Sequence, residues 1–417
     1  MKFYKKISVY LLFAVSLIIG FIFQENSSGG GKVDYEYIIP FIENFSIDFI
    51  SGFQNYVEEQ LSIIHSPVFY IIASFFLNIT GSLITVKLIY LLICIFLLFI
   101  FFKVLKEKNN LDNQIIFYLS LIIFFSPFFR SSAIWLLGDN LSLIFFGLSI
   151  YFFLKFENNN KINNFYLAII FLILCCYIRY YYCLFYIYYL FYIFKNQNLK
   201  ILLNILILSS ILSLPAFFYF FYVITNYQFF KTLSAFGNIN YVRSSLIILS
   251  IILFYLFPFI ISKKILIIKY YKKNYKIFFL IPFIFILFYF LDNFLRLNLI
   301  NFPSPRGGGV FIRLCSFYNI EPNFILIILS SISILVLDFL FKNDRLSNYL
   351  LLVILILSLP FFTIFQKYLD PLFFFLFFGL VKSDYLKQII NDKTINLIFI
   401  YIYFSSFYIF SLIYYLK

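Results

Sequence analysis

The 417-residue chain is 63% hydrophobic and 24% aromatic, whereas only 12% of its residues are charged. A soluble domain is about one quarter charged, so this composition excludes an ordinary soluble protein and indicates a chain that lives in a bilayer. The net charge of +14 comes from lysines clustered between apolar runs. That pattern points to membrane topology and not to a nucleic-acid partner.

Apolar runs of roughly twenty residues recur along the chain, which is the length that crosses a hydrocarbon core as a helix. The first run, 7–23, follows basic residues and lacks a small-residue cleavage site, so we expect a retained helix with a cytoplasmic N-terminus. We predict an all-α polytopic membrane protein, one integral membrane domain over 1–417. Its roughly thirteen transmembrane helices are expected at 7–23, 83–103, 114–129, 136–154, 165–182, 183–194, 201–225, 244–262, 277–291, 324–341, 349–365, 371–381 and 395–414.

Lysines and arginines are distributed differently on this map. Most lysines fall in segments expected in the cytoplasm, as the positive-inside rule requires. Six of the seven arginines lie on or near the predicted outer face: Arg130, Arg179, Arg243, Arg296, Arg306 and Arg313. Arg presents a planar fork suited to phosphate or carboxylate, so we expect the chemistry on the outer face. Interfacial snorkelling of single arginines is the alternative.

The first outer loop, 24–82, is rich in acidic residues. Residues 32–72 hold six of the eighteen carboxylates and the single histidine, His65. The apolar stretches "IIPFIENFSIDFI" and "SPVFYIIASFFLNIT" are too short to cross the membrane and predict helices lying in the outer interface. Such a helix would hold Asp34 partly desolvated beyond the first span, which suits a general base, with Glu36 as the second candidate. The remaining acids, among them Glu25, Glu58 and Glu59, are expected to solvate the loop.

A second outer loop, 292–323, contains Arg306, three glycines and Arg313. Glycine-rich backbone can turn its N–H groups toward an anion, and two arginines beside it would complete a phosphate cradle. The spacing does not match the Walker pattern, and a flexible turn is the alternative.

Further candidate substrate-binding residues lie at predicted outer ends of helices. Arg130 precedes Asp139 at the mouth of one span, Arg179 follows another, and Lys367, Tyr368 and Asp370 form a tight turn before Pro371. Lys87 is the main charge inside a predicted span. The cysteines show no metal-ligand spacing.

These segments resemble the GT-C superfamily of membrane glycosyltransferases that use polyprenyl-phosphate sugars. "VDYEYIIP" is similar to the Asp-Glu-x-x-x-Ile-Pro pattern of the dolichyl-phosphate-glucose glucosyltransferase branch, with Asp34 and Pro40 matching and Tyr35 in place of Glu. "HSPVFY" resembles a His/Thr-Pro-Pro-x-x-Tyr element, matching His65 and Tyr70 with Ser66 in place of a proline. "QKYLDP" is similar to an Arg/Lys-Tyr-x-x-Pro turn.

The resemblance implies an inverting transferase. A lipid-phosphate sugar would enter from the outer leaflet, and Asp34 would take the proton from an acceptor hydroxyl on a glycan, lipid or protein. Arg306 and Arg313 would stabilise the leaving phosphate. A bacterial inner membrane with the site facing the periplasm is the expected location. No cofactor is specified, although a divalent metal near the acids is compatible with the resemblance.

Two rival functions are a polymerase or ligase of lipid-linked oligosaccharides, and a transporter or flippase for such lipids. A transporter would line its path with charges near the middle of the membrane, and the predicted spans carry almost none.

Overall fold

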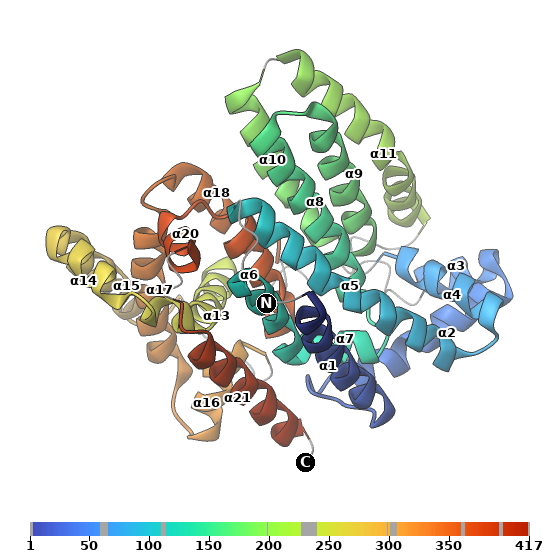
Figure 1. The fold of residues 1–417 in the computed structure, drawn as a ribbon, viewed down its shortest axis with the longest axis horizontal. Coiled ribbons are helices and arrows are strands. Elements are labelled where there is room, and N and C mark those ends of the chain that lie inside the picture. Colours follow the sequence, from blue (N-terminus) through green and yellow to red (C-terminus); the bar gives the residue numbers. More distant parts are fainter. Residues whose placement is uncertain are drawn as a thin grey trace. The chain divides into compact units, whose positions relative to one another are not determined.

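The computed structural model describes residues 3–58, 66–109, 114–197, 199–226, 240–297, 299–300, 307–359, 363–391 and 395–415. Every regular element in this part of the chain is a helix (Figure 1).

Seven described helices are long and apolar enough to cross a membrane. They are α5 (Leu83–Asn109), α8 (Asp139–Asn159), α11 (Leu199–Asn226), α13 (Tyr241–Ile261), α15 (Tyr275–Leu295), α17 (Pro322–Phe341) and α21 (Leu397–Tyr415). The prediction of an all-helical polytopic membrane protein is supported, whereas the count of thirteen spans is not confirmed.

An eighth span is possible where two helices meet at a bend. Helix α6 (Gln114–Ser120) continues as η2 (Leu121–Phe125), and after Ser126 the chain turns by 65° into α7 (Pro127–Ile134). Pro127 disfavours a helical conformation at the residue before it, and Ser126 is accordingly extended. The Ser126 side chain accepts a hydrogen bond from the Phe129 N–H and so caps the new helix.

The remaining predicted spans correspond to shorter helices. They are α1 (Phe3–Ile22), α9 (Ile162–Ile178), η3 (Tyr180–Leu184), α10 (Phe185–Asn196), α18 (Arg345–Leu357), α19 (Leu372–Phe375) and η5 (Leu376–Leu380). Other short elements are α14 (Lys264–Lys273), α16 (Gly309–Phe317), η4 (Gln366–Tyr368) and α20 (Asp384–Asn391).

Three helices occupy the segment 24–82: α2 (Gly31–Ile47), α3 (Phe49–Glu58) and α4 (Val68–Thr80). Helix α2 packs against both α3 and α4. Its buried residues recur at helical spacing and form one apolar stripe: Tyr35, Ile38, Phe41, Ile42 and Phe45. An in-plane placement of these helices in the membrane interface stays a prediction.

The chain divides into two compact units. Unit 1 comprises residues 1–235 and 404–417, and unit 2 comprises residues 236–403. In unit 1, α8 packs against α9 and α5. In unit 2, α17 packs against α13 and α15.

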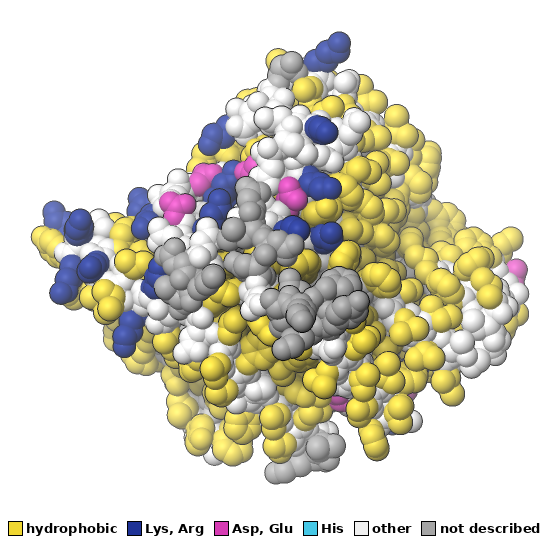
Figure 2. Space-filling model, viewed as in Figure 1, with side chains coloured by type: hydrophobic (Ala, Val, Ile, Leu, Met, Phe, Trp, Pro, Cys, Tyr) yellow, Lys and Arg dark blue, Asp and Glu magenta, His cyan; other side chains and the backbone are white. Residues whose placement is uncertain are grey.

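Several membrane-length helices expose apolar side chains. In the most apolar windows of α11 and α15 only 6% of residues are buried, and in α21 only 11%. Hydrophobic side chains also cover much of the face seen in Figure 2. Such surfaces are costly in water but suited to lipid, so the fold supports an integral membrane protein.

Candidate functional site

A bidentate salt bridge between Arg179 and Asp139, here called the fork, joins the end of α9 to the start of α8. Arg179 follows α9, and its Nε and Nη2 donate to the two carboxylate oxygens of Asp139 at 3.0 and 3.1 Å. Asp139 is the first residue of α8, where a carboxylate also faces the positive end of the helix dipole. The side chains are 12% and 24% exposed, so water screens this bidentate pair only weakly.

Tyr70 of α4 connects to this fork. Its side chain is 3% exposed, and its hydroxyl oxygen accepts a hydrogen bond from the Arg179 guanidinium. Burial raises the pKa of Tyr70 to about 12; the Arg179 charge opposes the rise, and the carboxylates of Asp139 and Asp34 add to it. The Tyr70 hydroxyl is therefore protonated at neutral pH and can donate a hydrogen bond.

Asp34 approaches the same group of residues from α2. It lies in the first turn of that helix, is half-buried, and is close enough to Tyr70 to affect the tyrosine's pKa. We call Asp34, Tyr70, Asp139 and Arg179 the Asp34 cluster. All four residues were candidates from sequence, and they come from four separate segments of unit 1.

Three tyrosines that the sequence pattern does not single out lie near the cluster: Tyr56, Tyr180 and Tyr219. Tyr56 of α3 is fully buried, and its ring centroid lies 5.5 Å from that of Tyr70. Burial raises the pKa of Tyr56 well above its ordinary value, with further contributions from Tyr70, Tyr219 and Tyr180. The "YYYC" run that contains Tyr180 looks from sequence like an interfacial aromatic belt, which is why it gave no signal for a site.

An aromatic cage encloses Lys87 of α5. The Lys87 ammonium lies 4.3 Å from the Trp135 ring centroid, 4.5 Å from that of Tyr35 and 5.6 Å from that of Phe21. Ring faces attract a cation, most strongly when it is partly desolvated, and Lys87 is half-buried. Within the part of the chain that the structure describes, no carboxylate forms a salt bridge with Lys87. Tyr35 follows Asp34 directly, so α2 carries one wall of this cage and one member of the Asp34 cluster.

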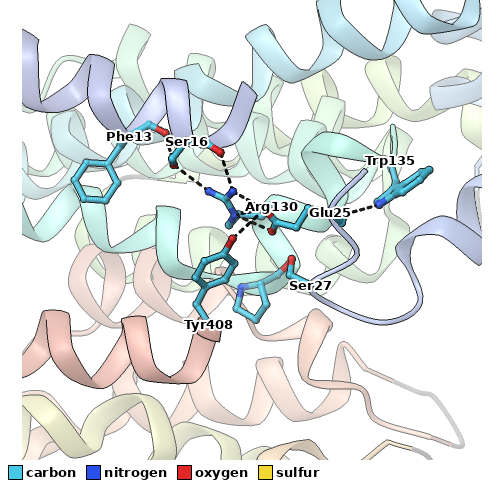
Figure 3. A network of polar contacts seen from close by, with 8 residues as sticks. Phe13, Ser16, Glu25, Ser27, Arg130, Trp135 and Tyr408 are labelled. Atoms are coloured by element: carbon cyan, nitrogen blue, oxygen red, sulfur yellow. Dashed lines mark hydrogen bonds and ion pairs between the residues drawn. The ribbon is translucent and has the colours of Figure 1, made fainter. Parts of the chain in front are cut away.

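Arg130 belongs to a separate network, shown in Figure 3. Its Nε and Nη2 donate to the Glu25 carboxylate at 2.8 and 2.5 Å, while Nη1 and Nη2 reach the side-chain and carbonyl oxygens of Ser16. The Tyr408 hydroxyl donates to the same carboxylate at 2.9 Å. The Arg130 and Glu25 side chains are 4% and 7% exposed, so the expectation that Glu25 solvates the loop is wrong. The network joins α7 to α1, to the segment that follows α1, and to α21.

The first loop contains two other candidate residues, Glu36 and His65. The Glu36 side chain is 61% exposed and lies 3.9 Å from Lys32, one helical turn earlier. This exposure favours Asp34 over Glu36 as the desolvated carboxylate. His65 lies outside the described residues.

The glycine-rich loop of unit 2 is docked onto the "QKYLDP" turn. The Gly308 N–H donates to the Ile364 carbonyl at 2.7 Å, and the Val310 N–H donates to the Gln366 side chain at 3.1 Å. Two N–H groups of the expected phosphate cradle therefore already donate to protein oxygens and do not point toward a bound anion. Arg313 is half-buried on α16, and Arg306 lies outside the described residues.

The turn itself is largely buried. Gln366 donates to the Tyr255 hydroxyl at 2.8 Å, and the Asp370 side chain, which is 2% exposed, lies close to the same hydroxyl. Lys367 and Tyr368 are half-buried. These residues belong to unit 2, whereas Asp34 belongs to unit 1.

No group of three or more His, Cys, Asp or Glu that could hold a metal ion occurs among the described residues. Comparison of the chain with protein-family models, with curated proteins and with solved structures found no match.

Proposed function

We propose that the protein is an inverting GT-C-type glycosyltransferase that moves a sugar from a polyprenyl-phosphate donor to an acceptor hydroxyl at the outer face of a membrane. The observation that carries this proposal is the Asp34 cluster. A half-buried carboxylate lies near a protonated tyrosine, whose oxygen accepts a hydrogen bond from a cation that a second carboxylate holds in place. Such a set can accept a proton and keep its charges fixed while a bond forms.

In the proposed reaction Asp34 removes the proton from the acceptor hydroxyl. The acceptor oxygen forms a bond to the anomeric carbon, and the bond from that carbon to the phosphate oxygen breaks. The polyprenyl phosphate leaves with the electron pair, and attack from the opposite face inverts the anomeric centre.

Arg179 acts here as a positioning residue. Its fork is occupied by Asp139, and its hydrogen bond to Tyr70 fixes the hydroxyl that lies near Asp34. Tyr70 can then donate to an acceptor or donor oxygen, while the rings of Tyr56 and Phe41 support Tyr70 at centroid distances of 5.5 and 6.1 Å. Aromatic walls with a few convergent polar groups are typical of small-molecule sites and suit the apolar faces of a sugar ring.

The leaving phosphate needs a cation. Arg306 and Arg313 remain the candidates by resemblance, and Lys87 is a third, since the described residues supply it with rings but with no ion-paired carboxylate. Lys87 also supports a second candidate function, a transporter of lipid-linked sugars, because a half-buried charge on a membrane-length helix often marks a transport path.

The test separates transfer from transport. The protein is reconstituted into liposomes with undecaprenyl-phosphate glucose, mannose or galactose and with an extract of cell-envelope lipids and glycans as acceptor. Release of free undecaprenyl phosphate from at least one donor supports a transferase. Movement of intact donor between leaflets without cleavage would instead establish the transporter.

A matched pair of variants then locates the base. Asp34→Asn should abolish release, whereas Glu43→Gln, which changes an exposed carboxylate on the same helix, should not. Loss of release in Glu36→Gln with full activity in Asp34→Asn would move the base to Glu36.

A further inference from the structure

The lysine-rich segment between α13 and α15 forms a surface helix, α14. Helix α13 ends at Ile261 and α14 begins at Lys264, while Asn274 alone separates α14 from α15. Because both neighbours are of membrane length, these short connections hold α14 where the two helices leave the hydrocarbon core.

One face of α14 is anchored to unit 2. The Tyr271 side chain is buried, and its hydroxyl donates to the Leu335 carbonyl. The Tyr270 hydroxyl donates to Asp338 at 2.9 Å, and Arg345 pairs with the same carboxylate at 3.2 Å. These contacts fix the rotation of α14 about its axis and so determine which side chains point outward.

The opposite face combines lysines with exposed isoleucines. Ile265 and Ile268 are 62% and 51% exposed. With 100° between successive residues, one half of the helix circumference carries Lys264, Ile265, Ile268, Lys269, Lys272 and Lys273. All four of these lysines are exposed. Lys and Arg side chains gather beside hydrophobic ones at the position of α14 in Figure 2.

The positive charge on this face is not balanced within the described chain. No described carboxylate forms a salt bridge with these four lysines, whereas Lys32 and Lys382 lie 3.9 Å from Glu36 and Asp344. A basic face with apolar side chains at the end of membrane-spanning helices is complementary to a negatively charged leaflet.

We propose that the outer face of α14 binds the headgroups of anionic phospholipids. The lysines contact the phosphates, and Ile265 and Ile268 enter the boundary between headgroups and acyl chains. The interleaved isoleucines and the flanking membrane helices favour a lipid surface over an acidic protein. This inference does not depend on the glycosyltransferase proposal.

The test measures binding of phosphatidylglycerol and phosphatidylcholine to the purified full-length protein by native mass spectrometry. Lys269→Gln with Lys272→Gln should lower the affinity for phosphatidylglycerol about tenfold and leave that for phosphatidylcholine unchanged. The control is Lys195→Gln with Lys200→Gln, an equal loss of charge at exposed lysines near the start of α11, and it should retain tight binding.

Three further measurements can contradict the proposal: a lysine-to-arginine variant, competition by inorganic phosphate and binding of polyglutamate. Lys269→Arg with Lys272→Arg should preserve lipid binding, which would show that charge and not lysine packing is responsible. Equal loss in the control and α14 variants would overturn the proposal. So would full displacement of the lipid by inorganic phosphate, which indicates a simple anion site, or equally tight binding of polyglutamate, which indicates an acidic protein partner.

Discussion

The fork between Arg179 and Asp139 depends on the shape of the guanidinium group. Two parallel N–H donors reach two carboxylate oxygens, a geometry that a lysine ammonium cannot reproduce. Arg179→Lys should therefore lower the melting temperature in detergent and reduce transfer at least tenfold, with the reduction in kcat and not in KM because Arg179 positions the reacting groups. A double-mutant cycle with Asp139→Asn should give a coupling free energy of about 1–2 kcal/mol. Additive effects would show that the fork contributes no coupling.

The pair of Glu25 and Arg130 is more deeply buried than this fork. Removing one partner leaves an uncompensated charge in an apolar setting, which costs about 3–5 kcal/mol. Glu25→Gln should therefore destabilise the protein strongly in thermal melts. Glu25→Leu combined with Arg130→Met should be less damaging than either single change, since no buried charge remains. If the loss of stability in the double variant equalled the sum of the two single losses, this role would be contradicted.

Residue chemistry was only partly predictable from sequence. Asp34, Tyr70, Asp139 and Arg179 could be selected because a charge or a motif position stands out in an apolar chain. The partner of Arg130 could not be selected from sequence, because Glu25 is 105 positions away and resembles the other acidic residues of a polar loop. Tyr56 and Tyr219 were hidden among 36 tyrosines.

At the scale of elements, the three glycines at the start of α16 set the path of the loop that leads into this helix. Gly307, Gly308 and Gly309 have φ of +98°, +79° and +80°, a region that side chains disfavour. A Cβ at Gly307 would also meet the Thr363 side chain and would lie 3.2 Å from the Ile364 carbonyl oxygen. The loop is therefore built to fit against the turn at 363–370.

Gly307→Ala should accordingly cost more stability than a positive φ alone explains. The matched control is Gly81→Ala, where φ is +66° but an added Cβ meets nothing within 4 Å. We expect the free energy of unfolding to fall by about 1–2 kcal/mol in the control and by clearly more in Gly307→Ala. Thermal melts of both variants measure this difference. Equal losses would mean that Thr363 moves aside and that the loop is not tightly docked.

Elements were predicted well where length and hydrophobicity decide the outcome. The runs at 83–103, 201–225 and 324–341 each lie within or over a membrane-length helix. The bend of 65° after Phe125 could not be placed from hydropathy, since Pro127 ends one helix and begins another inside a continuous apolar run.

At the scale of the molecule, hydropathy says which segments prefer lipid but not which polar side chains meet. The Asp34 cluster forms because α2, α4, α8 and α9 bring four distant segments of unit 1 together, and each contributes one polar residue to an otherwise apolar environment. Isolated polar groups at such positions are expensive, so each is stabilised by pairing with another, and the proposed function gives the group a shared chemical task.

The most direct measurement of that task compares donor binding and turnover for Asp34→Asn in one reconstituted preparation. If Asp34 is the general base, undecaprenyl-phosphate hexose should bind within about twofold of the wild-type affinity, while release of undecaprenyl phosphate should fall by about 10² to 10⁴-fold. Turnover at the wild-type rate in the correctly inserted variant would contradict the account.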